Sequence, residues 1–242
     1  QARLRYQATP TESFEVGTML SGDKQTRTQP SGNPALRTSD RKSLDFQRYD
    51  LAYRNEGADG SVVTVSPWYG HDGASRKINF GGIPASVENE SHLVGFRAEW
   101  RGHVAEPLSA TFGLDFEMVK TDSIRSGAIT FPPREGDPYV FGRAPADQLN
   151  YDQWSSTVVS AAPYVELDWA PFADMLHVVP GLRVEPYLIE AERRRPEVPG
   201  VPDFKAFTQA VSAQPRLSVS YAPIEALTLR ALELVDLIRH LC

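Results

Sequence analysis

Apolar and polar residues alternate without interruption over residues 106–120, EPLSATFGLDFEMVK. One set of positions holds Leu108, Ala110, Phe112, Leu114, Phe116 and Met118, and the other holds Ser109, Thr111, Gly113, Asp115 and Glu117. Successive side chains of a strand point to opposite faces, so the pattern predicts a strand with one apolar and one polar face. The strand is about twice the usual length of 5–6 residues.

The same alternation recurs along the chain and predicts an all-β fold. It is clearest over residues 3–8, 13–21, 94–101, 164–169, 182–188 and 216–221. We therefore expect about ten strands. Their approximate ranges are residues 2–9, 12–22, 42–55, 61–76, 91–104, 107–125, 154–171, 175–194, 206–222 and 226–231.

The connections between these strands alternate between short and long. The short ones, rich in Pro, Gly, Asp and Asn, are residues 9–12, 55–60, 103–107, 170–174 and 222–226. The long, polar ones are residues 22–42, 77–90, 122–153 and 192–207. An antiparallel up-and-down meander then has every short turn at one end and every long loop at the other, which is typical of an outer-membrane β-barrel.

Two irregularities qualify the strand assignment. Leu44 and Phe46 fall out of step with the apolar positions that follow them, which predicts a bulge within residues 43–54. Three prolines lie inside predicted strands, where each removes one donor from the hydrogen-bond ladder: Pro67, Pro163 and Pro186.

Aromatic residues on the apolar register cluster beside the short turns. They are Tyr6, Phe14, Tyr53, Trp100, Trp169 and Tyr221. Such residues form interfacial belts in membrane proteins, and a tilted spanning strand needs about 9–11 residues. We therefore expect the apolar face to meet lipid and the polar face to line a wet interior. A mean hydropathy of −0.36 agrees with this arrangement, because every second residue of a barrel strand is polar.

Composition narrows the class of protein. The chain has 242 residues, of which 41% are hydrophobic and 23% charged, so a disordered chain is excluded. A net charge of −6 argues against a nucleic-acid partner. Cys242 is the only cysteine, which excludes an internal disulfide and a cysteine-rich zinc site. Residues 1–6 alternate like a strand and lack a signal-peptide pattern.

Residues 215–230, PRLSVSYAPIEALTLR, resemble a hairpin that recurs in TonB-dependent outer-membrane receptors. There, a strand ending in an aromatic residue meets a short turn with proline, and the next strand opens with Leu-Thr-Leu-Arg. Residues 163–171, PYVELDWAP, are similar to another such strand end. The resemblance covers residues 1–231 and implies a partial transmembrane β-barrel.

The resemblance implies import of a scarce nutrient, such as a siderophore complex, across the outer membrane of a Gram-negative bacterium. It implies outer-membrane lipid and a small-molecule or metal-chelate ligand as partners, and neither enzymatic activity nor a cofactor. Complete receptors of this kind also have a plug domain, an energy-coupling box and more strands. This sequence shows neither plug nor box, so we expect the middle of a barrel whose plug and energy-coupling partner act in the full-length protein.

The last residues, 232–242, change period. Leu234, Ile238 and Leu241 recur at helical spacing. The segment is therefore interpreted either as a short helix or as a non-native tail, and the second interpretation is preferred.

Two groups of candidate site residues follow from this arrangement. Aromatic and arginine side chains of the long connection at 122–153 are candidates for ligand contact: Arg125, Phe131, Arg134, Tyr139, Phe141, Arg143, Tyr151 and Trp154. Charged residues of the polar register are predicted to face the lumen, where they contact the plug in the complete family or pair across strands: Arg97, Glu99, Arg101, Asp115, Glu117, Glu166, Asp168, Arg183 and Glu185.

Catalytic and metal motifs are absent from the sequence. It has no G-x-S-x-G, no H-E-x-x-H and no phosphate-binding glycine loop. His71-Asp72 is the one adjacent acid–base pair, and His92, His103 and His177 have no ligand spacing, so no metal site is predicted. Two alternatives stay open: a complete ten-stranded outer-membrane barrel, either a porin or a protease with a rim site, and a soluble β-sandwich binding module.

Overall fold

The computed structural model describes residues 1–127, 150–172, 175–195, 204–224, 227–234 and 237–241. The strands are β1 (Ala2–Gln7), β2 (Glu12–Gln29), β3 (Thr38–Glu56), β4 (Val62–Phe80), β5 (Ile83–Ala105), β6 (Leu108–Gly127), β7 (Asn150–Trp169), β8 (Leu176–Arg195), β9 (Lys205–Ile224), β10 (Leu227–Leu234) and β11 (Leu237–Leu241). A 3₁₀ turn, η1 (Pro34–Leu36), lies between β2 and β3. None of the described residues forms a helix that is long and apolar enough to cross a membrane.

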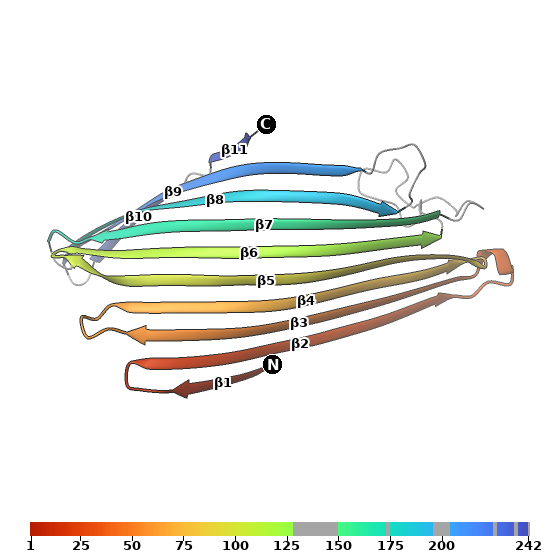
Figure 1. Cartoon of the computed structure of the whole chain (residues 1–242), viewed down its shortest axis with the longest axis horizontal. Coiled ribbons are helices and arrows are strands. Elements are labelled where there is room, and N and C mark those ends of the chain that lie inside the picture. The colour runs from red at the N-terminus through yellow and green to blue at the C-terminus, as the bar shows by residue number, and fades with distance from the viewer. Residues whose placement is uncertain (128–149, 173–174, 196–203, 225–226, 235–236, 242) are drawn as a thin grey trace.

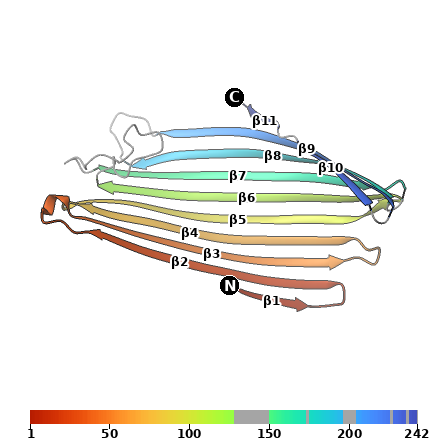
Figure 2. The ribbon, with the colours of Figure 1, turned by 180° about the vertical axis from the view of Figure 1, so that it is seen from behind.

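All the strands belong to one antiparallel sheet (Figures 1 and 2). β1 to β10 are paired in chain order, and β11 pairs with β9. The predicted all-β, up-and-down meander is therefore confirmed. A β-sandwich requires two sheets packed face to face, so that alternative is wrong for the part of the chain described here.

The strands are much longer than a membrane requires. β2 has 18 residues and β5 has 23, whereas a tilted spanning strand needs about 9–11. Roughly half of each long strand is therefore in excess of the length needed to cross a bilayer. The short turns gather at the left end of Figure 1, and η1 lies at the opposite end.

The predicted alternation of short turns and long loops is wrong at one connection. β4 and β5 continue through most of the expected loop and join at Gly81-Gly82 alone. Both glycines have positive φ, 58° and 90°, as a type I′ hairpin turn requires. β2 and β3 likewise extend to Gln29 and from Thr38. The tip of β2 and β3 is polar on both faces, so its sequence has no hydrophobic period that distinguishes a strand from a loop. At the tip of β4 and β5 the apolar positions Ile78, Phe80, Ile83 and Ala85 lie on the register that is polar farther down the strands, so the alternation changes phase there.

Ion pairs support the tall hairpin of β3 and β4. Arg76 donates two hydrogen bonds to the Asp40 carboxylate, at 3.0 and 2.7 Å. These bonds hold the pKa of Asp40 below its ordinary value. They connect β3 and β4 near the ends of these strands that are remote from the short turns.

The bulge predicted within residues 43–54 is absent. β3 keeps one register with β2 and one with β4, so Leu44 and Phe46 lie on the polar face instead of returning to the apolar one. The Arg48 guanidinium lies 4.2 Å from the centre of the Phe46 ring. A cation over an aromatic ring is attracted by its quadrupole, which explains how an aromatic residue is accommodated on a polar face.

The three prolines lie inside strands as predicted, and they coincide with gaps in the pairing. Ladder partners are missing between β3 and β4 beside Pro67. They are also missing between β7 and β8, where Pro163 and Pro186 come close in register. A missing N–H donor accounts for both gaps.

The end of the chain is strand where a helix was one of two interpretations. β10 pairs Leu234 with Arg216, and β11 pairs Leu237 with Ala213, so the two strands follow the same edge of β9 in one register. Hydrogen bonding to that edge overrides the weak helical spacing of the sequence. The boundary at residue 231 and a non-native origin of residues 232–242 stay predictions.

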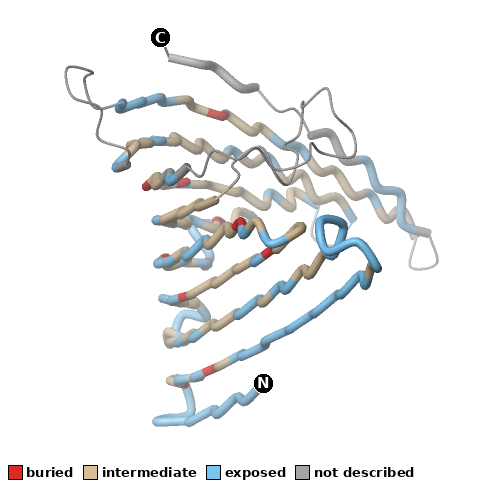
Figure 3. Tube along the Cα trace, turned by 90° about the vertical axis from the view of Figure 1, so that its right-hand side faces the viewer, coloured by how far each residue is buried: buried red, intermediate tan, exposed pale blue. Residues whose placement is uncertain are grey.

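The sheet is a single curved layer without a closed core (Figure 3). Its buried apolar residues are few, and in the described ranges they are Ile78, Ala85, Ala110 and Ala162. Many large apolar side chains are instead exposed, among them Phe112 at 48% and Trp169 at 48%. A layer of this kind needs a covering on its apolar face.

Candidate functional site

The apolar face carries a band that ends in aromatic rings on both sides. It contains the pairs Phe96–Phe116 and Trp100–Phe112, with ring centres 5.6 and 5.7 Å apart. These residues share a face, as predicted, because they alternate with Arg97 and Asp115 along β5 and β6 and face each other in the register.

Further rings mark the two limits of this band. Phe14 and Tyr53 lie 5.0 Å apart near the short turns, and Tyr49 and Tyr69 lie 6.3 Å apart toward the other end. Beyond Tyr69 the same register becomes polar, with Gln47, His71, His92 and Lys120. Aromatic residues at both limits of an apolar band are the arrangement found at the two interfaces of a membrane.

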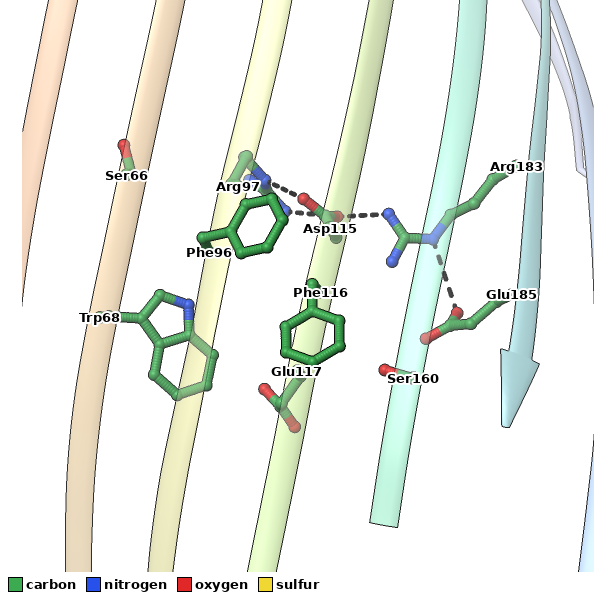
Figure 4. A pocket seen from close by; sticks show the side chains of 10 residues that line it. All are labelled: Ser66, Trp68, Phe96, Arg97, Asp115, Phe116, Glu117, Ser160, Arg183 and Glu185. Carbon is green, nitrogen blue, oxygen red and sulfur yellow. Dashed lines mark hydrogen bonds and ion pairs between the residues drawn. The ribbon is translucent and has the colours of Figure 1, made fainter. Parts of the chain in front are cut away.

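Charged side chains converge on the opposite, polar face. Asp115 accepts two hydrogen bonds from Arg97, at 2.6 and 3.0 Å, and one from Arg183, at 2.5 Å (Figure 4). Glu185 lies 3.5 Å from the other side of the Arg183 guanidinium. Four charges from β5, β6 and β8 thus form one network across the sheet. The Asp115 side chain is 18% exposed, so it is the least solvated partner in its two bridges.

The network borders a hollow of about 520 Å³. Its polar wall also includes Ser66, Trp68, Glu117 and Ser160 (Figure 4). A second hollow of about 280 Å³ adjoins it and is lined by Glu99, Tyr164, Gln214 and Arg216. Tyr164 donates a hydrogen bond of 2.8 Å to Glu99, and Arg216 donates one to Glu166.

All nine residues predicted to face the lumen lie on this polar face. Besides those already placed, Arg101 lies 3.4 Å from Glu99, and Asp168 lies 2.9 Å from His177. Tyr164, Arg216 and His177 take part but were missing from the prediction. Tyr164 and Arg216 occupy the polar register of predicted strands. Their place in that register could have identified them as residues of the polar face. That this face borders a lumen stays a prediction.

Gly113 makes room for the Tyr164 ring. A Cβ at residue 113 would lie 2.1 Å from the ring carbon that carries the Tyr164 hydroxyl. Replacing Gly113 with alanine should displace the ring from Glu99 and destabilise the barrel by about 1–3 kcal/mol, the usual cost of overpacking. Urea unfolding of the lipid-reconstituted protein measures this. Gly22→Ala is the control, because its nearest contact would be an ordinary 3.6 Å, and an equal loss in both variants would contradict the expectation.

The predicted ligand-contact residues are only partly described. Phe131, Arg134, Tyr139, Phe141 and Arg143 lie outside the described residues. Arg125 lies on β6, and Tyr151 and Trp154 lie on β7, near the ends of the strands that flank residues 128–149. The Trp154 ring lies edge-on to Phe204, with ring centres 5.6 Å apart. Ligand contact by this set stays a prediction.

His71 and Asp72 do not form the acid–base pair that their adjacency suggested. Neighbouring residues of a strand point to opposite faces. Asp72 accepts two hydrogen bonds from Arg48 on the polar face, at 2.7 and 2.9 Å. His71 is on the other face, 3.2 Å from Glu90. The only residues that suggested a rim protease are thus separated by the sheet.

Comparison with protein families decides the identity of this arrangement. Residues 3–231 match the model described as "TonB dependent receptor-like, beta-barrel". The chain belongs to this family. Its members are receptors of the Gram-negative outer membrane. The family that the hairpin at residues 215–230 suggested is therefore confirmed. No curated protein sequence matches closely enough to add a relative.

Solved structures of similar fold include a siderophore receptor, a ferric citrate transporter and a copper transporter. The siderophore receptor PiuA from Acinetobacter baumannii is 12% identical, with a TM-score of 0.60, over 92% of this chain and 39% of its own. The unliganded ferric citrate transporter FecA is 13% identical, with a TM-score of 0.64, over 94% and 34%. The copper transporter OprC is 11% identical, with a TM-score of 0.50, over 92% and 36%. At these identities the likeness concerns the fold alone, and this receptor-barrel chain spans little more than a third of each relative.

Proposed function

We propose that this receptor-barrel chain is part of an outer-membrane transporter that imports a scarce nutrient, such as a siderophore complex, with energy supplied from the inner membrane. A plug domain and an energy-coupling protein are the partners in the full-length protein. The observation that carries the proposal is the division of the sheet into two faces. One carries the aromatic-bounded band, and the other carries the Arg97–Asp115–Arg183–Glu185 network beside its hollow.

The polar face suits the wall of a lumen filled by a plug. Its charges are mixed in sign and are largely paired with one another, so the wall has no strong preference for one sign of diffusing ion. The exposed ends of these side chains, such as Arg97 at 61%, still offer hydrogen bonds to a domain lying against them. A plugged barrel requires polar contacts of this kind between its wall and the plug.

Ligand selection is assigned to the end remote from the short turns. We include there the aromatic and arginine residues from Arg125 to Trp154, because rigid rings and bidentate guanidinium groups suit the carboxylate and catecholate oxygens of metal chelates. The structures of similar fold belong to a siderophore receptor, a ferric citrate transporter and a copper transporter. An iron chelate is therefore our first candidate substrate.

Energy-dependent uptake tests this function. Cells that produce the full-length receptor should accumulate radiolabelled iron from ferric citrate or a ferric siderophore. A protonophore, or deletion of the energy-coupling protein, should reduce uptake by at least about tenfold, because release from a plugged barrel requires work. Cells lacking the receptor are the control. Uptake that persists without the proton gradient would indicate a passive porin, and saturable binding of no metal chelate would contradict the substrate class.

A further inference from the structure

Two histidines that are far apart in the sequence meet on the apolar register, just beyond the band. His71 of β4 and His92 of β5 are direct cross-strand partners, and their ring centres lie 5.0 Å apart. Glu90 Oε1 lies 3.2 Å from His71 Nε2 and 3.5 Å from His92 Nε2. The sequence spacing gave no hint of this group, because the β4–β5 hairpin brings the residues together.

The distances suit a first-row divalent metal ion. Zinc bonds to nitrogen and oxygen are about 2.0–2.2 Å, so neighbouring ligand atoms of a tetrahedral site lie roughly 3.3–3.5 Å apart. The two distances from Glu90 fall close to this range, and all three ligand atoms lie within 4.8 Å of one another. Two imidazoles and one carboxylate are also a common zinc ligand set that leaves one position for water.

An oxygen atom lies near the second ring nitrogen of each imidazole. The Tyr69 hydroxyl lies 2.8 Å from His92 Nδ1, which leaves Nε2 for a metal. Asp45 Oδ1 lies 3.7 Å from His71 Nδ1. That nitrogen is buried and makes no hydrogen bond within the described part of the chain. Metal-bound histidines usually donate their second ring N–H to a neighbouring oxygen, and both positions for such an oxygen are present.

The surroundings favour a cation. His71 and Glu90 border a hollow of about 350 Å³ whose wall also includes Asp45, Glu88 and Asp122. Lys77 neutralises Glu88 at 3.0 Å. Asp122 Oδ1 is buried without a hydrogen bond to any residue that the structure describes. Lys120 of β6 is the cross-strand partner of His92 and is the nearest cation in the register.

We propose that His71, Glu90 and His92 bind a divalent transition metal of the zinc type on the outer wall of the receptor barrel. The metal would join β4 and β5 next to the Tyr49–Tyr69 rings, on the side remote from the short turns, where the apolar band ends. The site lies on the opposite face from the Arg97–Asp115–Arg183 network, so it is independent of the imported ligand. The location of the site on the outer wall rests on the proposal that the apolar face of the sheet points to lipid. The ability of the three residues to bind metal does not depend on that proposal.

Calorimetric titration of the detergent-purified, metal-free, full-length receptor with Zn²⁺ tests the proposal. We expect His71→Gln and His92→Gln each to weaken one binding event by at least about tenfold, since losing even a residue that only orients a ligand costs about 10–100-fold. His103→Gln, on the same strand as His92, is the matched control and should bind like the parent. Visible absorption of bound Co²⁺ should change in the same variants, because it reports nitrogen ligands.

The outcomes are distinct. Loss of one Zn²⁺ equivalent in both variants and its retention in the control supports the site. Absence of zinc binding in the parent protein overturns the proposal without reference to any variant. Equal binding by the parent and both variants also overturns it, because the metal is then held elsewhere. The retarded gel mobility of an unheated barrel verifies that each variant is folded.

Discussion

Replacing Leu114 with arginine should lower the free energy of unfolding by about 2–4 kcal/mol, the cost of a cation at the lipid-facing midplane of a barrel. Leu114 lies on the apolar register of β6, between Phe112 and Phe116, and its cross-strand neighbours are Ala98 and Pro163. None of these neighbours offers a partner for a guanidinium. Urea unfolding of the full-length receptor in lipid vesicles measures the loss.

Thr111→Arg is the matched control for this experiment. Thr111 lies on the same strand, on the polar register, opposite Arg101 on β5 and Glu166 on β7. An arginine there meets water and a carboxylate, so the expected change is below about 1 kcal/mol. If Thr111→Arg were the more destabilising of the two, the faces would be assigned the wrong way round, and the apolar register would line the interior.

Replacing Asp115 with alanine should cost about 2 kcal/mol and weaken the contact between the barrel and its plug. The change leaves Arg97 and Arg183 close together without their shared carboxylate. Removing one member of a fully buried pair costs about 3–5 kcal/mol. We expect less here because the Arg97 side chain is 61% exposed. Asp115→Asn should retain part of the stability, since its amide oxygen still accepts a hydrogen bond.

Glu15→Ala provides the comparison for Asp115. Glu15 of β2 also pairs with an arginine of the adjacent strand, since its carboxylate lies 3.1 Å from the Arg3 guanidinium. The side chains of Glu15 and Arg3 are 31% and 58% exposed, respectively. A solvated pair of this kind contributes about 0–1 kcal/mol. The two variants are compared by urea unfolding in lipid vesicles. Equal losses for Asp115→Ala and Glu15→Ala would show that the network has no special role in stability.

The sequence by itself determined the architecture. Period-two alternation in EPLSATFGLDFEMVK and its counterparts was sufficient for an antiparallel meander of two-faced strands. It also placed Arg97, Asp115 and Arg183 on one face, because a strand allows only two directions for a side chain. The family followed from the hairpin at residues 215–230. These features depend only on residues that are close together in the sequence, so they can be predicted from the sequence alone.

Tertiary structure decided what depends on cross-strand register. The unbroken register past Phe46 and the strand at Leu237–Leu241 come from ladder hydrogen bonds, which polar or helically spaced sequence does not reveal. The convergence of Arg97 and Arg183 on Asp115 and the meeting of His71 with His92 have the same origin. Pairing brings together residues that are 18 to 68 positions apart, and the alternation of one strand gives its faces but not its alignment with the next.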